Sequence, residues 1–335
     1  METFTRPTAV FAMASWARDG AFPPDVMDRL CRLVDLDPAL TLTTFDAPAA
    51  TTALRHADIL ITGWGCPRVG GAVLRAAPRL RACVHAAGSV KRLLDPVVFQ
   101  RGLTVSSAAD ANAVPVAEYT IAMLVLAAKQ ALTLSRQYGS TGRMPGVPPA
   151  GGLLGATVGV VGASRIGRMV LARLTDFGVT RLLHDPTIPP EQAARLGAEP
   201  VDLDELCRRS DLLTVHAPAL PQTRHLLDDR RLALMPDGAV LINTARGSLV
   251  DTAALLRHCA GGRISAVLDV TDPEPLPPGH PLLSLPNVHI TPHLAGAQGR
   301  EMRRLGEFAT AEIDRLLNGR PLLGAVSAGD LALSA

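Results

Sequence analysis

Four clusters of polar side chains follow predicted strands in the second half of the chain. They are His216-Ala-Pro218, Asn243-Thr-Ala-Arg246, the segment from Asp269 to Glu274, and Thr291-Pro-His293. Histidine and glutamate can exchange protons with a substrate, and an arginine can bind a carboxylate through its planar fork of donors. Because ligands bind at the carboxyl ends of parallel strands, we expect these side chains to gather at one site.

A glycine-rich segment precedes these clusters and reads Val158-Gly-Val-Val-Gly162-Ala-Ser-Arg-Ile-Gly167. It runs from a predicted strand into a predicted helix, as does the turn that cradles a dinucleotide pyrophosphate. Gly162 allows the tight turn, and Gly167 lets the helix and the strand approach closely. Ser164 replaces the usual middle glycine; its side chain takes up space, but its hydroxyl can donate to a phosphate.

The residues after this turn predict how a dinucleotide would be held. N–H groups at the start of the helix, around Arg165 and Ile166, point toward the pyrophosphate, whose negative charge the helix dipole favours. Asp185 ends the next predicted strand, where a carboxylate accepts hydrogen bonds from ribose hydroxyls and repels a 2′-phosphate. No basic residue is adjacent, so the sequence favours NAD over NADP. A turn cap is the alternative role for Asp185.

The elements that must position these residues alternate between short apolar strands and helical patterns, which predicts parallel sheets covered by helices. In the first third of the chain, strands are expected over residues 9–12, 41–45, 58–62, 82–85 and 104–106. Later strands are expected over residues 157–161, 181–184, 212–215, 239–243, 266–270 and 288–291. The predicted helices cover residues 26–33, 71–76, 116–136, 166–177, 203–208, 230–235, 252–258 and 300–317. Residues 142–152 are rich in glycine and proline and predict a loop.

The composition excludes several functional classes. Hydrophobic residues make up 47% of the 335 residues and charged residues 19%, so the chain is not disordered and suggests about two domains. The net charge is +2 with no block of like charge, which argues against a nucleic-acid or membrane surface. The 5 cysteines are scattered and form no CxxC pair, so we expect no disulfide framework, no metal site and a reducing cytoplasm. Glu118 and Lys129 interrupt the apolar stretch 116–134, which predicts a buried helix rather than a membrane span.

The order of these motifs resembles that of the NAD-dependent D-isomer-specific 2-hydroxyacid dehydrogenase family over nearly the whole chain. The resemblance is carried by Asn112…Val116-Ala-Glu118, the glycine-rich turn, His216-Ala-Pro218, Asn243-Thr-Ala-Arg-Gly247, Asp269…Glu274-Pro and Thr291-Pro-His293…Ala295-Gly296. It implies an α/β fold with two parallel sheets. A Rossmann dinucleotide-binding domain, residues 113–296, would be inserted into a flavodoxin-like substrate-binding (catalytic) domain made of residues 1–112 and 297–335.

The same resemblance implies a catalytic set of Arg246, Glu274 and His293. A cationic His293 would give a proton to the carbonyl oxygen of a 2-oxo acid as hydride adds to its carbon, which yields a D-2-hydroxy acid. Glu274, hydrogen-bonded to the imidazole, would stabilise that cation and orient the ring. Arg246 would hold the substrate carboxylate and polarise the carbonyl. The alternatives are an NAD(H)-binding regulator with little turnover and a short-form phosphoglycerate-type dehydrogenase.

The resemblance also implies contacts to the cofactor and the substrate. The further cofactor contacts are His216, Ala217, Pro218, Thr223, Thr244, Ala245, Asp269, Ala295 and Gly296. The substrate contacts are Gly88, Ser89, Val90 and Lys91 in one loop, together with Trp64, which is otherwise a core residue. Lys91 and Arg92 stand where the family usually has Asp-Asn, and would receive a second anionic group unless they form a solvated helix start. A homodimer through the cofactor domain is implied as well.

Overall fold

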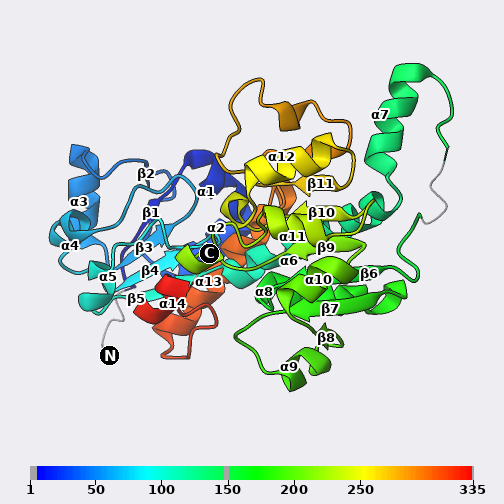
Figure 1. Ribbon diagram of the computed structural model, residues 1–335. Coiled ribbons are helices and arrows are strands. Elements are labelled where there is room, and N and C mark those ends of the chain that lie inside the picture. Colours follow the sequence, from blue (N-terminus) through cyan, green and yellow to red (C-terminus); the bar gives the residue numbers. More distant parts are fainter. Residues whose placement is uncertain (1–5, 147–150, 334–335) are drawn as a thin grey trace. The chain divides into compact units, whose positions relative to one another are not determined.

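The computed structural model describes residues 6–146 and 151–333 (Figure 1). The chain divides into two compact units, one made of residues up to 113 and from 297 onward, the other of residues 114–296. The first is called the outer unit below, and the second the inserted unit. Of the predicted loop 142–152, residues 147–150 lie outside the described residues.

A five-stranded parallel sheet forms the centre of the outer unit, in the order β2-β1-β3-β4-β5. Its strands are β1 (Ala9–Ala12), β2 (Thr41–Leu42), β3 (Ile59–Thr62), β4 (Ala82–His85) and β5 (Thr104–Ser107). This is the flavodoxin-like strand order. Alternate residues of β1 pack into different hydrophobic clusters, Phe11 into one and Val10 into the other, so both faces of the sheet are covered.

Helices of the outer unit cover these two faces. They are α1 (Ser15–Ala21), α2 (Pro24–Leu33), α3 (Pro48–His56), α4 (Gly71–Ala76), α5 (Val97–Gln100) and α13 (Arg303–Leu317). A short helix, α14 (Ala328–Leu333), follows them near the end of the chain. The predicted last helix is confirmed as α13, preceded by a short 3-10 helix over Gly299–Met302. Leu305, Ala309 and Ile313 form its buried stripe, which brings the end of the chain back to the sheet that the beginning of the chain builds.

The inserted unit contains a seven-stranded parallel sheet in the order β12-β11-β10-β9-β6-β7-β8. Its strands are β6 (Thr157–Val161), β7 (Thr180–His184), β8 (Glu199–Pro200), β9 (Leu212–Val215), β10 (Val240–Asn243), β11 (Ser265–Leu268) and β12 (Val288–Ile290). Read from β8, the first six strands follow the Rossmann order, and β12 adds a seventh. The predicted fold class, with a Rossmann and a flavodoxin-like parallel sheet, is therefore confirmed.

The helices of the inserted unit connect successive strands. They are α8 (Arg165–Arg173), α9 (Pro190–Arg195), α10 (Leu203–Arg209), α11 (Asp229–Leu234) and α12 (Thr252–Ala260). The predicted helix 166–177 is shorter, because its last turn is a 3-10 helix over Leu174–Phe177. Gly178 follows with φ +65° and ends the helical path, a conformation that glycine adopts without penalty.

One predicted helix has the wrong bounds. Residues 116–136 belong to two helices, α6 over Ala109–Ala128 and α7 over Ala131–Thr141. Between them, Gln130 takes a left-handed conformation with φ +51°, which ends one helical path before the next begins. No glycine or proline marks this position, so the sequence pattern runs through the break.

By length and composition, α6 could cross a membrane. A single helix of this kind is a weak indication, because an apolar core helix passes the same test. Within this one chain 33% of its most apolar window is buried, so the prediction of a buried helix is only partly met here.

Candidate active site

The glycine-rich turn lies between β6 and α8 and depends on two close approaches. Gly162 has φ +98°, and a Cβ there would lie 2.7 Å from the amide nitrogen of Ala217. A Cβ on Gly167 would lie 2.0 Å from the carbonyl oxygen of Gly162. Both positions therefore require glycine, and the turn brings the start of α8 against the segment after β9.

Ser164 is the N-cap of α8. Its hydroxyl oxygen accepts a hydrogen bond from the N–H of Gly167 at 3.3 Å. A serine in the place of the middle glycine thus has a local role, because it satisfies one of the N–H groups that a helix start leaves without a partner. The predicted contact of this hydroxyl with a phosphate stays a prediction.

Asp185 follows β7 and fastens two neighbouring turns. Its carboxylate accepts hydrogen bonds from the N–H of Ala163 at 2.6 Å, and from the N–H and hydroxyl of Thr187 at 2.8 and 2.6 Å. Burial raises the pKa of Asp185, but these hydrogen bonds outweigh it and hold the pKa below its usual value. The alternative role of a turn cap is therefore present. The residue also lines a hollow of about 340 Å³ with His184, Pro186, Ile188, Ala193 and Val201.

His216 lies under the glycine-rich turn. Its Nε2 is 2.9 Å from the hydroxyl of Thr214, and its buried Nδ1 has no partner among the described residues. Burial lowers the pKa of His216 to about 3, so the ring is neutral. The next loop is closed by Thr223, whose hydroxyl donates to the carbonyl of Pro218 at 2.6 Å. His216 and Ala217 thus pack against the glycine-rich turn, and Thr223 closes the loop that follows them.

Arg246 follows β10 in a turn that Asn243 holds. The fully buried Asn243 amide donates to the carbonyl of Arg246 at 2.9 Å and accepts the N–H of Ala245 at 3.0 Å. A Cβ on Gly247 would lie 2.0 Å from the backbone of Thr271, so the turn presses against the segment that follows β11. Asn243 belongs to a motif recognised in the sequence, but its two hydrogen bonds within this turn could be seen only in the folded chain.

His293 and Glu274 form a hydrogen-bonded pair. His293 Nδ1 lies 2.5 Å from Glu274 Oε1, and the two side chains are 51% and 40% exposed. Because a carboxylate only accepts, Nδ1 carries the proton of this bond, and Nε2 remains for exchange with a substrate. His293 has φ +51°, which is uncommon for a residue other than glycine and marks a turn held by its surroundings.

The buried Asp269 supplies that hold. Its carboxylate is 2% exposed and accepts the hydroxyl of Thr291 at 2.7 Å and the N–H groups of Leu294 and Ala295, each at 2.9 Å. Its backbone carbonyl accepts the N–H of His293 at 3.0 Å. Asp269 was predicted as a cofactor contact; the structure shows it organising the turn that carries His293. Sequence reasoning missed Thr291 as one of its partners.

Neighbouring strands bring the three predicted catalytic residues to one edge of the sheet. Arg246 follows β10, Glu274 follows β11 and His293 follows β12, and these strands are adjacent in the sheet. The predicted cofactor residue Thr244 lies at the same edge, where its hydroxyl is 3.0 Å from that of Thr120 on α6.

The predicted substrate loop lies at the corresponding edge of the outer unit, after β4. The hydroxyl of Ser107 donates to the carbonyl of Gly88, and the N–H of Lys91 donates to the hydroxyl of Ser89 at 3.3 Å. Trp64, after β3, stacks on the half-exposed Trp16 with ring centroids 5.9 Å apart. Sequence reasoning missed both Ser107 and Trp16. The signal for Trp16 was its place directly after β1.

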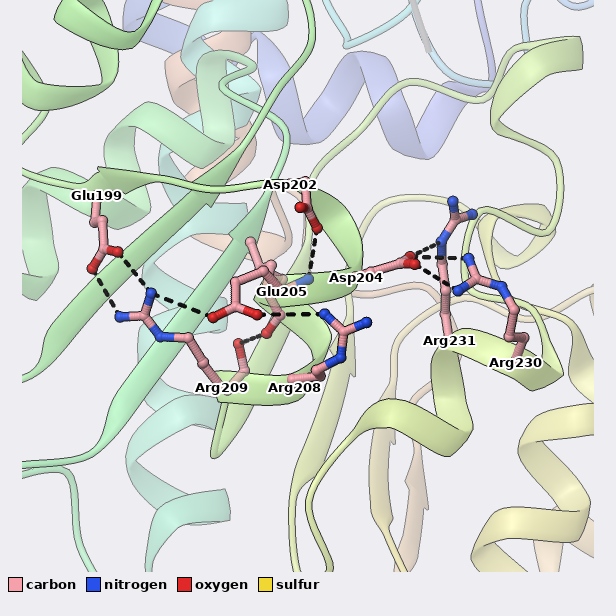
Figure 2. Close-up of polar contacts among 10 residues, drawn as sticks. Glu199, Asp202, Asp204, Glu205, Arg208, Arg209, Arg230 and Arg231 are labelled. Carbon is pink, nitrogen blue, oxygen red and sulfur yellow. Dashed lines mark hydrogen bonds and ion pairs between the residues drawn. The ribbon is translucent and has the colours of Figure 1, made fainter.

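Figure 2 shows a network of exposed charges on the inserted unit. Asp204 contacts Arg230 at 2.6 Å and Arg231 at 3.1 Å, and Arg209 contacts Glu199 at 2.7 Å. Hydrogen bonds from Arg230 and Arg231 hold the pKa of Asp204 well below its usual range. Such mutual pairing is typical of a solvated surface. Over residues 6–146 and 151–333, no group of histidine, cysteine and acidic residues is arranged to hold a metal ion.

Comparison with known proteins shows to which family the chain is similar. The model of the NAD binding domain of D-isomer specific 2-hydroxyacid dehydrogenases matches residues 121–295. A D-3-phosphoglycerate dehydrogenase of Methanocaldococcus jannaschii is 35% identical over 272 residues, which are 79% of this chain and 51% of that relative. The chain thus spans about half the length of that relative.

Two further relatives align over nearly their whole length. A glyoxylate reductase of Aeropyrum pernix is 31% identical over 308 residues, which are 89% of this chain and 91% of the relative. The crystal structure of the TT0316 protein from Thermus thermophilus is 32% identical, covers 96% of this chain and 100% of its own, and has a TM-score of 0.75. The chain belongs to the D-isomer specific 2-hydroxyacid dehydrogenase family.

Proposed function

We propose that this protein is an NAD-dependent oxidoreductase that interconverts a 2-oxo acid and a D-2-hydroxy acid. The observation that carries the proposal is the hydrogen bond between His293 Nδ1 and Glu274 Oε1 at 2.5 Å. An imidazole held by a carboxylate is the usual arrangement of a general acid and base. Arg246, which follows the next strand but one in the same sheet, adds the cation that a carboxylate substrate requires.

Each of the three side chains has a separate task in this reaction. Arg246 binds the substrate carboxylate through paired N–H donors and draws electron density from the adjacent carbonyl. His293, protonated on both nitrogens, gives the Nε2 proton to the carbonyl oxygen, and Glu274 stabilises the imidazolium and keeps its ring oriented. The reduced nicotinamide, when bound, supplies the hydride, so that 2-oxo acid, NADH and a proton become D-2-hydroxy acid and NAD⁺. In the oxidative direction, neutral His293 accepts the proton.

The inserted unit fits a dinucleotide. Gly162 and Gly167 allow the tight turn that presents the N-terminus of α8, and the hollow of about 340 Å³ beside Asp185 offers room for an adenosine. The lowered pKa of Asp185 keeps its carboxylate charged at neutral pH, which favours ribose hydroxyls and repels the 2′-phosphate of NADP. We assign cofactor binding to this unit and substrate binding to the outer unit.

The substrate loop bears on the choice of acid. N–H groups at Ser89 and Val90 suit a carboxylate, and the cations of Lys91 and Arg92 suit a second anionic group such as a phosphate. The relatives named D-3-phosphoglycerate dehydrogenase and glyoxylate reductase support two classes of acid, one with that second group and one without. Lys91→Ala is expected to raise the KM for phosphohydroxypyruvate and to leave the KM for glyoxylate unchanged. An unchanged preference would exclude the second-anion site.

Turnover tests the proposal directly. Wild-type protein should oxidise NADH with at least one acid of a panel containing glyoxylate, hydroxypyruvate and phosphohydroxypyruvate, and His293→Ala should not. NADH binding without turnover on any member of the panel would instead support a regulator that senses the cofactor.

We further propose a homodimer formed through the inserted unit, in the cytoplasm. None of the residues of α7 is buried, and Figure 1 shows this helix standing out from the sheet of its own unit. Tyr138, Met144 and Leu154 are exposed apolar side chains of α7 and the segment after it. Apolar surface of this kind is suited to a symmetric interface. Light scattering should give twice the chain mass; a monomer would contradict the proposal.

A further inference from the structure

We propose that Tyr119 of α6 is a positioning residue for His293, acting through the hydroxyl of Thr291 and the carboxylate of Asp269. The inference rests on the proposed function and deepens it, because it assigns a role in the same reaction to Tyr119 and Thr291, which are not among the predicted substrate and cofactor contacts. It concerns the inserted unit alone, in which all four residues lie.

The hydrogen bonds run in one direction. Tyr119 Oη is 2.8 Å from Thr291 Oγ1, which is 2.7 Å from Asp269 Oδ1. An ionised carboxylate has no proton to give, so the Thr291 hydroxyl donates its one proton to Asp269. The oxygen of Thr291 must then accept from Tyr119. Each bond polarises the next, and the chain of donors ends on a buried negative charge.

Protonation of the tyrosine supports this direction. Burial raises the pKa of Tyr119 more than its hydrogen bond with Thr291 lowers it, and the charge of Asp269 raises it further. The phenol therefore remains a donor throughout the pH range in which an enzyme of this family would be assayed.

The same contacts bracket His293. Thr291 precedes it by two residues, and the N–H groups of Leu294 and Ala295 just after it bind the same Asp269 carboxylate. Between these anchors, His293 holds a left-handed φ of +51°, a conformation that a residue with a Cβ adopts only where its surroundings enforce it. Loss of an anchor lets the turn relax toward ordinary φ values, and the imidazole then moves away from Glu274.

A second contact with α6 restrains the far end of this segment. Asn112, in the first turns of α6, accepts the N–H of Ala297 at 3.1 Å through its side-chain oxygen. Asn112 and Ala297 both belong to the outer unit, so this second contact lies outside the inserted unit that contains Tyr119 and Thr291. Of these two hydrogen bonds, that of Tyr119 ends on Thr291, two residues before His293. Its loss is therefore expected to move the imidazole more than the loss of the Asn112 bond.

Tyr119→Phe tests the inference, because it removes one hydroxyl and keeps the ring. We expect kcat to fall roughly 10- to 100-fold, the loss typical of a slightly misplaced catalytic group, while the Kd of NADH and the Tm stay near wild type. Thr291→Val should lower kcat to a similar extent, and Thr291→Ser, which keeps the hydroxyl, should restore most of it. The chain offers a matched control in Tyr138→Phe, since Tyr138 is its other tyrosine and is half-exposed.

A second measurement does not depend on turnover. The ring proton signals of His293 can be identified among the 9 histidines by their loss in His293→Ala. In Tyr119→Phe they should shift at constant pH, and in Tyr138→Phe they should not. Unshifted signals, or a fall in kcat accompanied by equal losses of NADH affinity and Tm, would overturn the inference. If the wild-type protein turned over no acid, the proposed function would fail, and the histidine signals would still decide whether Tyr119 positions His293.

Discussion

Among the described residues, two carboxylates are almost wholly buried, one in each unit, and their hydrogen bonds are alike, although Glu312 also has Arg315 at 3.9 Å. Asp269 is 2% exposed and Glu312 is 1% exposed. Asp269 accepts one hydroxyl and two successive backbone N–H groups. Glu312 does so too, from the hydroxyl of Ser106 at 2.6 Å and the N–H groups of Leu323 and Gly324 at 3.0 and 2.9 Å. Such charge-assisted bonds let a carboxylate remain buried.

The segments that they hold are different. Asp269 holds a turn with the half-exposed His293 in a left-handed conformation. Glu312 holds residues 323–324 against β5, beside the bridge between Ser106 and Ala325, and its segment contains no candidate site residue. A buried carboxylate with three donors thus aims a side chain in one unit and fastens a returning chain segment in the other. We expect substitutions at the two sites to separate activity from stability.

The largest expected effect is on the side chain that Asp269 aims. His293→Ala should lower turnover by about 10²–10⁴-fold, the usual contribution of a general acid, with NADH affinity unchanged. The matched change in the other segment is Leu323→Ala, which removes a 65% exposed side chain and should leave turnover unaltered. Steady-state NADH oxidation measures both. Equal turnover in the two variants would contradict the claim that Asp269 positions a side chain needed for activity.

Exchanging each acid for its amide sharpens the contrast. Asp269→Asn turns an acceptor into a donor that faces N–H groups, so the turn shifts and kcat should fall about 10²-fold. Glu312→Gln should keep kcat near wild type but lower the free energy of unfolding by about 2 kcal/mol, because hydrogen bonds to a charged group are lost. Urea titrations and kcat values are to be compared for both. The comparison fails if Glu312→Gln loses activity without losing stability.

Each unit also contains one buried, neutral histidine. From these two residues we predict how the stability of the chain depends on pH. Burial lowers the pKa of His85 to about 4 and that of His216 to about 3. An unfolded histidine has a pKa of about 6.5, so below that pH the unfolded chain binds protons that the folded chain does not. Stability is therefore expected to fall as the pH drops from about 6.5 toward those folded values, by about 2 kcal/mol per histidine between about pH 7 and pH 5.

Glutamine at either position tests this pH dependence. His85→Gln and His216→Gln should each unfold with a weaker dependence on pH than the wild type, as followed by urea titration at both pH values. Because each unit contains one of these two buried histidines, a change confined to one variant would show that only that unit limits the stability of the chain. An unaltered dependence in both variants would contradict the prediction.

The smallest effect is expected on the exposed charges of Figure 2. Hydrogen bonds from Arg230 and Arg231 hold the pKa of Asp204 well below its usual range, but solvent screens these exposed contacts. Its contribution is present above the unfolded pKa, about 4, and is lost as the pH falls below that value. Arg230→Ala should change Tm far less than Glu312→Gln does, and about 0.5 M salt should remove the remaining difference. A loss of Tm that did not depend on salt would contradict this prediction, because the network would then contribute to stability as the buried carboxylates do.

Several elements could be predicted from the sequence because they depend on neighbouring residues. The bounds of β1, β4, β6 and β9 agree with the predicted ranges. Parallel strands buried on both faces read as continuous apolar runs, and turn residues end them. The two-residue strand β8 and the helices α1, α3 and α9 were missed, because short elements carry little periodic signal. The break at Gln130 was missed for a related reason, since one left-handed residue leaves no mark in an apolar stretch.

The chemically active groups could be read from the amino-acid sequence: a glycine-rich turn, an aspartate after the next strand, and an arginine, a glutamate and a histidine after later strands. These patterns are local, so neighbouring residues suffice to reveal them. The contacts that hold these groups in place became visible with the folded chain. Tyr119 and Thr291 are 172 residues apart, and Ser106 and Glu312 are 206 apart. A hydrogen bond requires its two atoms to meet, and the fold alone brings such distant residues together.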